Sequence, residues 1–164
     1  MTGQWLGRAV NSSLAGSYGI GWKEMRAGLC RIMQDYCGEY KNEQTLQMGI
    51  RWMDSIFESE ASRAFARNPH ELCRTLENLT HITVGKIIME ASLARKASSL
   101  HLDFKRMDYP DVDPPEWNKI ITMRQENGDI KKGELPLDYW LRPPYAPSYE
   151  ENYREHCELR KGWE

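Results

Sequence analysis

Residues 68–96 read NPHELCRTLENLTHITVGKIIMEASLARK and give the strongest helix signal in the sequence. Asn68 is a typical N-cap, Pro69 suits the first helical position, and Glu71, three residues after the cap, completes a capping box. Apolar residues then recur at helical spacing up to about Lys96, which predicts one long amphipathic helix. These apolar positions are Leu72, Leu76, Leu79, Val84, Ile87, Ile88, Ala91 and Leu93.

Two further helices are predicted before this one. The first runs from Trp22 to about Glu39, and the second starts after the N-cap Asn42 and runs to about Ala66. Each carries one apolar stripe, so three helices with short connections predict an antiparallel three-helix bundle over residues 22–100. The stripes are Met25, Leu29, Ile32, Met33 and Tyr36 in the first helix, and Leu46, Ile50, Met53 and Phe57, widened by Gly49, Trp52 and Ile56, in the second.

The segments on either side of the bundle have other patterns. Residues 1–21 hold five glycines and no sustained period, which predicts an irregular N-terminal leader. Within residues 101–141, a polar and aromatic segment is followed by Asn127-Gly128 between apolar residues, which predicts a β-hairpin in the same domain as the bundle. Residues 142–164 begin with a proline-rich run typical of an extended tail, and Ser148 to Arg160 could close it with a short helix. The predicted fold class is mainly α: an antiparallel three-helix bundle followed by a β-hairpin and an extended C-terminal tail.

Composition excludes several function classes. A formal net charge of -2 at pH 7 gives no electrostatic signature of nucleic-acid binding. The sequence has no run of about 20 apolar residues for a membrane span and no opening signal peptide, so a cytoplasmic location is expected. The four cysteines lack metal-binding spacing and are expected to be reduced. The histidines are too far apart to share a metal, and no phosphate loop or nucleophile elbow is present, so neither a metal site nor a catalytic site is predicted.

Polar and aromatic residues crowd together directly after the third predicted helix, in residues 95–117. This stretch is too polar for a core and too aromatic for a passive linker, so we expect the protein to contact a partner here. The predicted interface residues are Arg95, His101, Arg106, Asp108, Tyr109, Asp113 and Trp117.

The charges of this stretch also allow other interpretations. Arg106 and Asp108 could pair locally in a structural role, or His101 could act as an acid–base group beside Arg106. Because no nucleophile or cofactor site accompanies His101, we favour the structural interpretation. A run of carboxylates could bind a hard cation, but it lacks the glycine and the terminal acidic ligand of a calcium loop, so surface charge or ion pairing is favoured. The carboxylates of this run are Asp108, Asp111, Asp113 and Glu116.

Several motifs, taken together, resemble the C-terminal helical domain of succinate dehydrogenase and fumarate reductase flavoproteins. The resemblance extends from Trp22 to Leu141, and the spacing between Arg95 and Arg106 is most similar to the alpha subunit of adenylylsulfate reductase and its relatives. The motifs are Trp22-Lys23-Glu24-Met25, Met33-Gln34-Asp35-Tyr36-Cys37-Gly38, Asn42-Glu43-x-x-Leu46-x-x-Gly49-Ile50, Ala94-Arg95-Lys96, Arg106-x-Asp108-Tyr109-Pro110-x-x-Asp113 and Trp117.

The resemblance implies a part of an FAD-dependent oxidoreductase. In that family the FAD-binding and substrate-capping domains come first and hold the flavin and the catalytic residues, so this chain is expected to bind no cofactor and to have no catalytic residue of its own. The implied partners are the FAD-binding domain, in the same or a companion chain, and an iron–sulfur subunit for electron transfer. The alternative is a free-standing helical interaction module that has lost the enzyme. A homodimer of the isolated domain is a further expectation, because a detached domain would expose apolar surface.

The sequence departs from the family pattern at one motif. The family's Arg-x-Glu-Ser/Thr-Arg is replaced by Arg95-x-Ala97-Ser98-Ser99, which loses one acidic and one basic residue. This change puts in question any polar contact that the two lost residues make in relatives, and it favours the interaction-module alternative.

Overall fold

The computed structural model describes residues 19–126, 129–144 and 147–161. The chain divides into two units, with the boundary between Asp113 and Pro114, and each unit is described by itself. Of the predicted N-terminal leader, residues 1–18 lie outside the described part of the chain.

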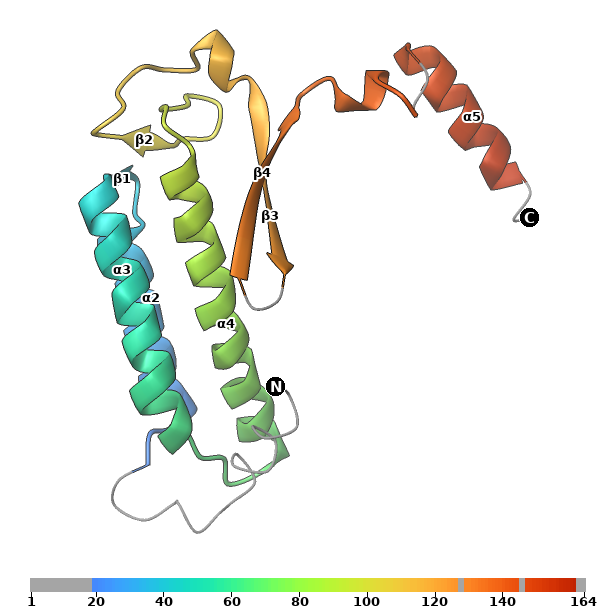
Figure 1. Ribbon diagram of the computed structural model, residues 1–164. Coiled ribbons are helices and arrows are strands. Elements are labelled where there is room, and N and C mark those ends of the chain that lie inside the picture. Colours follow the sequence, from blue (N-terminus) through green and yellow to red (C-terminus); the bar gives the residue numbers. More distant parts are fainter. Residues whose placement is uncertain (1–18, 127–128, 145–146, 162–164) are drawn as a thin grey trace. The chain divides into compact units, whose positions relative to one another are not determined.

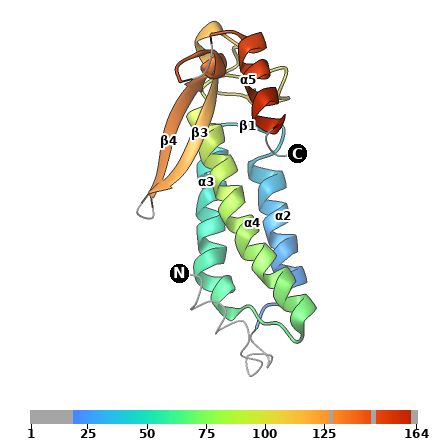
Figure 2. The same ribbon diagram turned by 90° about the vertical axis from the view of Figure 1, so that its right-hand side faces the viewer.

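Three long helices form the first unit: α2 (Trp22–Tyr36), α3 (Glu43–Ser55) and α4 (Pro69–Ala94). They lie side by side with alternating chain direction in two perpendicular views (Figures 1 and 2). A π-helical turn, η2 (Ile56–Glu60), and a 3-10 turn, η3 (Ala61–Arg63), continue α3 toward the predicted end near Ala66. The predicted mainly α fold with an antiparallel three-helix bundle is therefore confirmed.

Side chains cap two of these helices as the sequence predicts. Asn42 Oδ1 accepts a hydrogen bond from Thr45 N at 2.9 Å, and Thr45 Oγ1 accepts one in return from Asn42 N at 3.1 Å. Asn68 Oδ1 likewise accepts from Glu71 N at 2.9 Å. The carboxylate of Glu71 accepts from Arg67 N rather than from Asn68 N, so the second half of the predicted capping box is displaced by one residue.

The core of the bundle lies where the three helices meet. Its buried residues are Met25, Leu29, Ile32, Leu46, Met53, Ala64, Ile82 and Met89. Two glycines allow close helix approach: a Cβ atom on Gly49 would lie 2.7 Å from Tyr36 Cβ, and one on Gly85 would lie 3.0 Å from Met53 Cε. The predicted stripe of α4 is wrong in part, because Val84 and Ile88 are exposed. The buried face is instead Thr75, Asn78, Ile82, Gly85, Met89 and Ser92.

The second unit contains the predicted β-hairpin. Strands β3 (Lys119–Glu126) and β4 (Asp129–Pro136) pair antiparallel, from Lys119 opposite Pro136 to Glu126 opposite Asp129. The predicted Asn127-Gly128 turn lies outside the described residues. Short 3-10 turns η4 (Pro115–Trp117) and η5 (Tyr139–Leu141) flank the hairpin, and helix α5 (Tyr149–Lys161) forms where the sequence allowed a short closing helix.

Candidate functional site

Residues 95–113, here called the end segment, fold across one end of the bundle, where α4 stops and α3 starts (Figure 1). Two short strands hold it there: β2 (Lys105–Arg106) pairs in parallel with β1 (Tyr40–Lys41), which directly precedes the cap of α3. Isolated bridges join Ser99 to Phe104 and Ser98 to Val112. The segment is therefore a hydrogen-bonded structure, which its polar and aromatic composition did not indicate.

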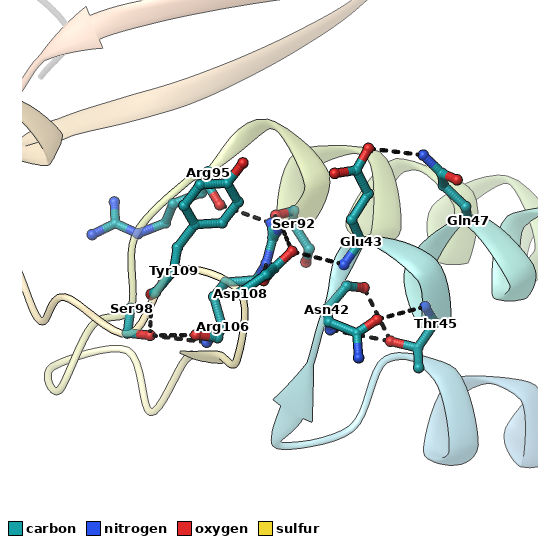
Figure 3. A network of polar contacts seen from close by, with 10 residues as sticks. All are labelled: Asn42, Glu43, Thr45, Gln47, Ser92, Arg95, Ser98, Arg106, Asp108 and Tyr109. Atoms are coloured by element: carbon teal, nitrogen blue, oxygen red, sulfur yellow. Dashed lines mark hydrogen bonds and ion pairs between the residues drawn. The ribbon is translucent and has the colours of Figure 1, made fainter.

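The side chain of Arg106 is the centre of this structure (Figure 3). It is only 2% exposed, yet each part of its guanidinium has a partner. Nη1 donates to the carbonyl oxygens of Ser92 at 2.5 Å and Arg95 at 2.9 Å, which are among the carbonyls that a helix C-terminus leaves unpaired. Nε and Nη2 donate to the two carboxylate oxygens of Asp108 at 2.8 and 2.7 Å. This two-pronged geometry is the stronger form of an arginine–carboxylate pair.

Asp108 extends the contact from α4 to α3. Its Oδ2 also accepts a hydrogen bond of 2.9 Å from Glu43 N, at the first residue of α3, where a negative charge is stabilised by the helix dipole. The hydrogen bonds from Arg106, followed by the one from Glu43 N, lower the pKa of Asp108 to about 2. Arg106 and Asp108 thus join the end of α4 to the start of α3, and the predicted local pairing of these two residues is confirmed.

A second set of contacts fixes the rest of the end segment. Ser98 Oγ accepts from Arg106 N at 2.9 Å and donates to the Tyr109 carbonyl at 2.9 Å. Asp113 Oδ2 accepts from Leu100 N at 3.0 Å, and Asp113 Oδ1 lies 3.5 Å from Arg95 Nη2. Hydrogen bonds from the Ser99 side chain and from the Leu100 backbone lower the pKa of Asp113. Asp108 and Asp113 are therefore used within the fold.

The structure places the seven predicted interface residues in different settings. Arg106 is buried, whereas Arg95 and Tyr109 are half-buried; the Tyr109 ring centroid lies 5.0 Å from the Arg106 guanidinium. His101 is exposed on the turn between Ser99 and Phe104, and Arg106 is occupied by protein groups, so the two do not form an acid–base pair facing solvent. Trp117 belongs to the second unit, where the Lys119 ammonium lies 4.3 Å from its ring centroid. The assignment of these residues to an interface stays a prediction.

Sequence reasoning missed a buried lysine in this region. Lys41 is buried in β1, its ammonium lies 4.6 Å from the Phe104 ring centroid, and burial lowers its pKa. No local pattern distinguishes Lys41 from a surface lysine. The strand that pairs with β1 is β2, which comes more than sixty residues later in the chain.

The two residues that depart from the family motif are both buried. Ala97 is fully buried, and Ser99 makes two backbone hydrogen bonds to Phe104, of 2.8 and 2.9 Å. A small side chain therefore fills each place where the family pattern has a charged one. These two positions therefore bury no charge. A buried charge would need a partner and hydrogen bonds to offset the free energy lost when it leaves water.

The described residues do not form an FAD cradle of the dinucleotide-binding type. Such a cradle needs a parallel strand, a glycine-rich turn and a helix whose free N-terminus receives the pyrophosphate. The nearest arrangement is β1 followed by α3, but Asn42 alone connects them, and the first amide of α3 donates to Asp108. Among the described residues, the start of α3 therefore does not fit the pyrophosphate of FAD.

The described residues also bear on metal binding and membrane insertion. Within residues 19–126, 129–144 and 147–161, no three His, Cys, Asp or Glu side chains gather as they would around a metal ion. None of the helices in these ranges combines the length and apolar character needed to cross a membrane.

Solved structures show where this fold occurs. Adenylylsulfate reductase from Archaeoglobus fulgidus superposes with a TM-score of 0.68 at 21% identity, over 73% of this chain and 20% of that one. A variant of the E. coli quinol fumarate reductase flavoprotein matches with a TM-score of 0.68 at 21% identity, over 86% and 24%. Mycobacterium smegmatis Sdh1 matches with a TM-score of 0.62 at 17% identity, over 79% and 22%. The chain thus spans between a fifth and a quarter of each of these proteins.

A sequence profile assigns the family. None of the curated proteins matches the chain. The profile described as fumarate reductase flavoprotein C-term matches residues 26–149, which include the whole of α3, α4, the end segment and the hairpin. The chain therefore belongs to the family of fumarate reductase flavoprotein C-terminal domains.

Proposed function

We propose that this chain serves as the C-terminal helical domain of an FAD-dependent oxidoreductase and performs no catalysis by itself. The observation that carries the proposal is the family match over residues 26–149. FAD is held by another domain, in the same polypeptide or in a companion chain. The helical domain packs on that flavin domain and supports the docking of an electron-transfer subunit of the iron–sulfur type, in the cytoplasm.

The end segment supports this assignment of roles. The charged groups of Arg106 and Asp108 are engaged with each other, with carbonyls at the end of α4 and with the first amide of α3, which suits a structural role. A buried arginine that binds two carbonyls and a carboxylate stabilises a fold, whereas a catalytic arginine needs donors that face the substrate. Arg95, His101, Tyr109, Asp113 and Trp117 remain the proposed interface, with Arg106 and Asp108 supporting it.

A second candidate is a free-standing helical interaction module. The observation that favours it is the replacement of two charged family residues by Ala97 and Ser99, both buried here. Such a module would keep the fold and bind a partner that carries no flavin.

Purification from the source organism distinguishes the two. The chain carries an affinity tag at its C-terminus and is isolated under mild conditions, and the visible absorbance of flavin is measured against protein concentration. We expect flavin to elute with an assembly larger than 164 residues, while the pure 164-residue chain takes up no FAD on titration. Stoichiometric FAD on the pure chain would refute its role as a cofactor-free domain. Isolation of the chain with a partner free of flavin would favour the interaction module.

A further inference from the structure

Large apolar side chains point into solvent around the end segment. Five of them are between 60% and 76% exposed: Tyr40, Leu100, Leu102, Met107 and Val112. Among the described residues, the other large hydrophobic side chains with this exposure are Tyr149 and Tyr153, which belong to the second unit. A concentration of exposed apolar groups at one end of the bundle is the usual mark of a contact surface. We call these five residues the apolar end.

Backbone hydrogen bonds hold the apolar end in place. Tyr40 lies beside Lys105 in the β1–β2 pair, and Met107 N donates to the Lys41 carbonyl at 2.9 Å. The turn that carries Leu100 and Leu102 is closed by two hydrogen bonds between Ser99 and Phe104. A surface that is already ordered loses little conformational entropy when a partner covers it.

The charges around the apolar end balance one another. Residues 95–113 contain four basic and four acidic residues, so their formal net charge is zero with His101 neutral. Lys105 pairs with Glu39 and with Asp103, and Arg95 pairs with Asp113. A neutral surface with exposed leucines fits an apolar protein face, whereas nucleic acid or an anionic membrane would require an excess of positive charge.

We propose that the apolar end is the surface on which the flavin-binding domain docks, and that Arg106 and Asp108 act as its scaffold from behind. This inference rests on the proposed function. The occupant follows from the length of the solved neighbours, in which this fold is a fifth to a quarter of a longer chain, so most of each polypeptide lies outside the matched domain. Exposed apolar surface favours a contact with such a remainder, and the large side chains of the apolar end are the most exposed ones among the described residues of the first unit.

Methionine oxidation tests the location of the contact. Met107 on the apolar end and Met48 on α3 are both exposed, so peroxide should convert both to sulfoxide in the pure chain. In the flavin-containing assembly isolated from the source organism, we expect Met107 to react about tenfold more slowly, because the centre of an interface excludes water, while Met48 keeps its rate. Mass spectrometry of the peptides measures both rates in one sample.

Charge insertion tests the energetics. Leu100→Asp with Leu102→Asp places two carboxylates on the apolar end, and Met48→Asp with Trp52→Asp is the matched control on an exposed part of α3. We expect the first pair to reduce the flavin recovered with the tagged chain about tenfold or more, and the control pair to leave it unchanged. Far-UV circular dichroism and urea midpoints verify that both variants fold.

The outcomes distinguish failure of the docking surface from failure of the proposed function. Flavin recovered in full with the Leu100 and Leu102 variant, or Met107 reacting equally fast in the assembly, would overturn the docking surface and leave the proposed function intact. Absence of flavin from every purified assembly would overturn both. Protection of Met107 in the pure chain that disappears on dilution would show that a second copy covers the apolar end, which also overturns the inference.

Discussion

Replacement of Arg106 by alanine is expected to destabilise the first unit severely. The change removes four hydrogen bonds, leaves the carbonyls of Ser92 and Arg95 without their buried donor, and leaves Asp108 without its cation. Removal of one partner from a buried ion pair costs roughly 3–5 kcal/mol. The Asp108 side chain is 27% exposed and can recover some hydration, so we expect a loss of about 3 kcal/mol. Against a total stability of roughly 5–15 kcal/mol, this is a large fraction.

Urea denaturation followed by far-UV circular dichroism measures this loss. The midpoint should fall while the slope of the transition stays constant, because the change acts on the folded state and not on the surface exposed by unfolding. Arg106→Lys is an informative second variant, because an ammonium keeps the charge but cannot contact two carbonyls and both carboxylate oxygens as the planar guanidinium does. We expect it to lower the free energy of unfolding by an intermediate amount, about 1–2 kcal/mol. Arg51→Ala, at an exposed position of α3, is the control and should change stability by less than about 0.5 kcal/mol.

A small change in the free energy of unfolding would refute the structural role of Arg106. If Arg106→Ala lowers the free energy of unfolding by less than about 1 kcal/mol with an unchanged slope, the guanidinium is not needed to join α4 to α3. A loss of partner binding in that same stable variant would then make Arg106 a contact residue, as the sequence alone suggested.

Two further predictions concern Asp108 and the helix contacts. The pKa of Asp108 is lowered from 3.8 to about 2, so its contribution to stability is complete above pH 5 and is lost as the pH falls toward 2. Asp108→Asn should remove that part of the acid dependence, seen as urea midpoints that change less between pH 6 and pH 2. Gly49→Ala should destabilise by about 1–3 kcal/mol, because its Cβ would lie 2.7 Å from Tyr36 Cβ. Gly28→Ala, with Ile56 Cδ1 at 3.8 Å as its nearest neighbour, should instead stabilise by about 0.5–1 kcal/mol, and equal effects of the two would contradict the close contact.

Local signals predicted most of the secondary structure. The caps at Asn42 and Asn68 depend on side chains that bond within three residues, so they can be read from a single sequence. The hairpin is equally local, because its two strands are close together in the sequence. These features need no knowledge of what packs against them.

The packing of the helices and the pairing of distant strands were harder to predict. Helix α4 has apolar residues on more than one side, so periodicity alone did not show that Gly85 and Met89 face the bundle while Val84 and Ile88 do not. The face chosen brings Gly85 close to Met53, a contact that exists only once α3 is in place. The β1–β2 pair was missed for a similar reason, since each strand has two residues and its partner is distant in the chain.

In the end segment, residue type alone did not distinguish buried side chains from exposed ones. Charged residues are mostly exposed in proteins, so burial of Arg106 could not be expected from its residue type. Here the carbonyls at the end of α4 stabilise the buried Arg106, and the first amide of α3 binds its ion-pair partner Asp108. Leu100, Leu102 and Met107 are among the exposed residues of the segment. Experiments should distinguish the scaffold, Arg106 and Asp108, from the apolar end. Substitutions in the scaffold should reduce both the stability of the domain and partner binding, whereas charges placed on the apolar end should reduce partner binding alone.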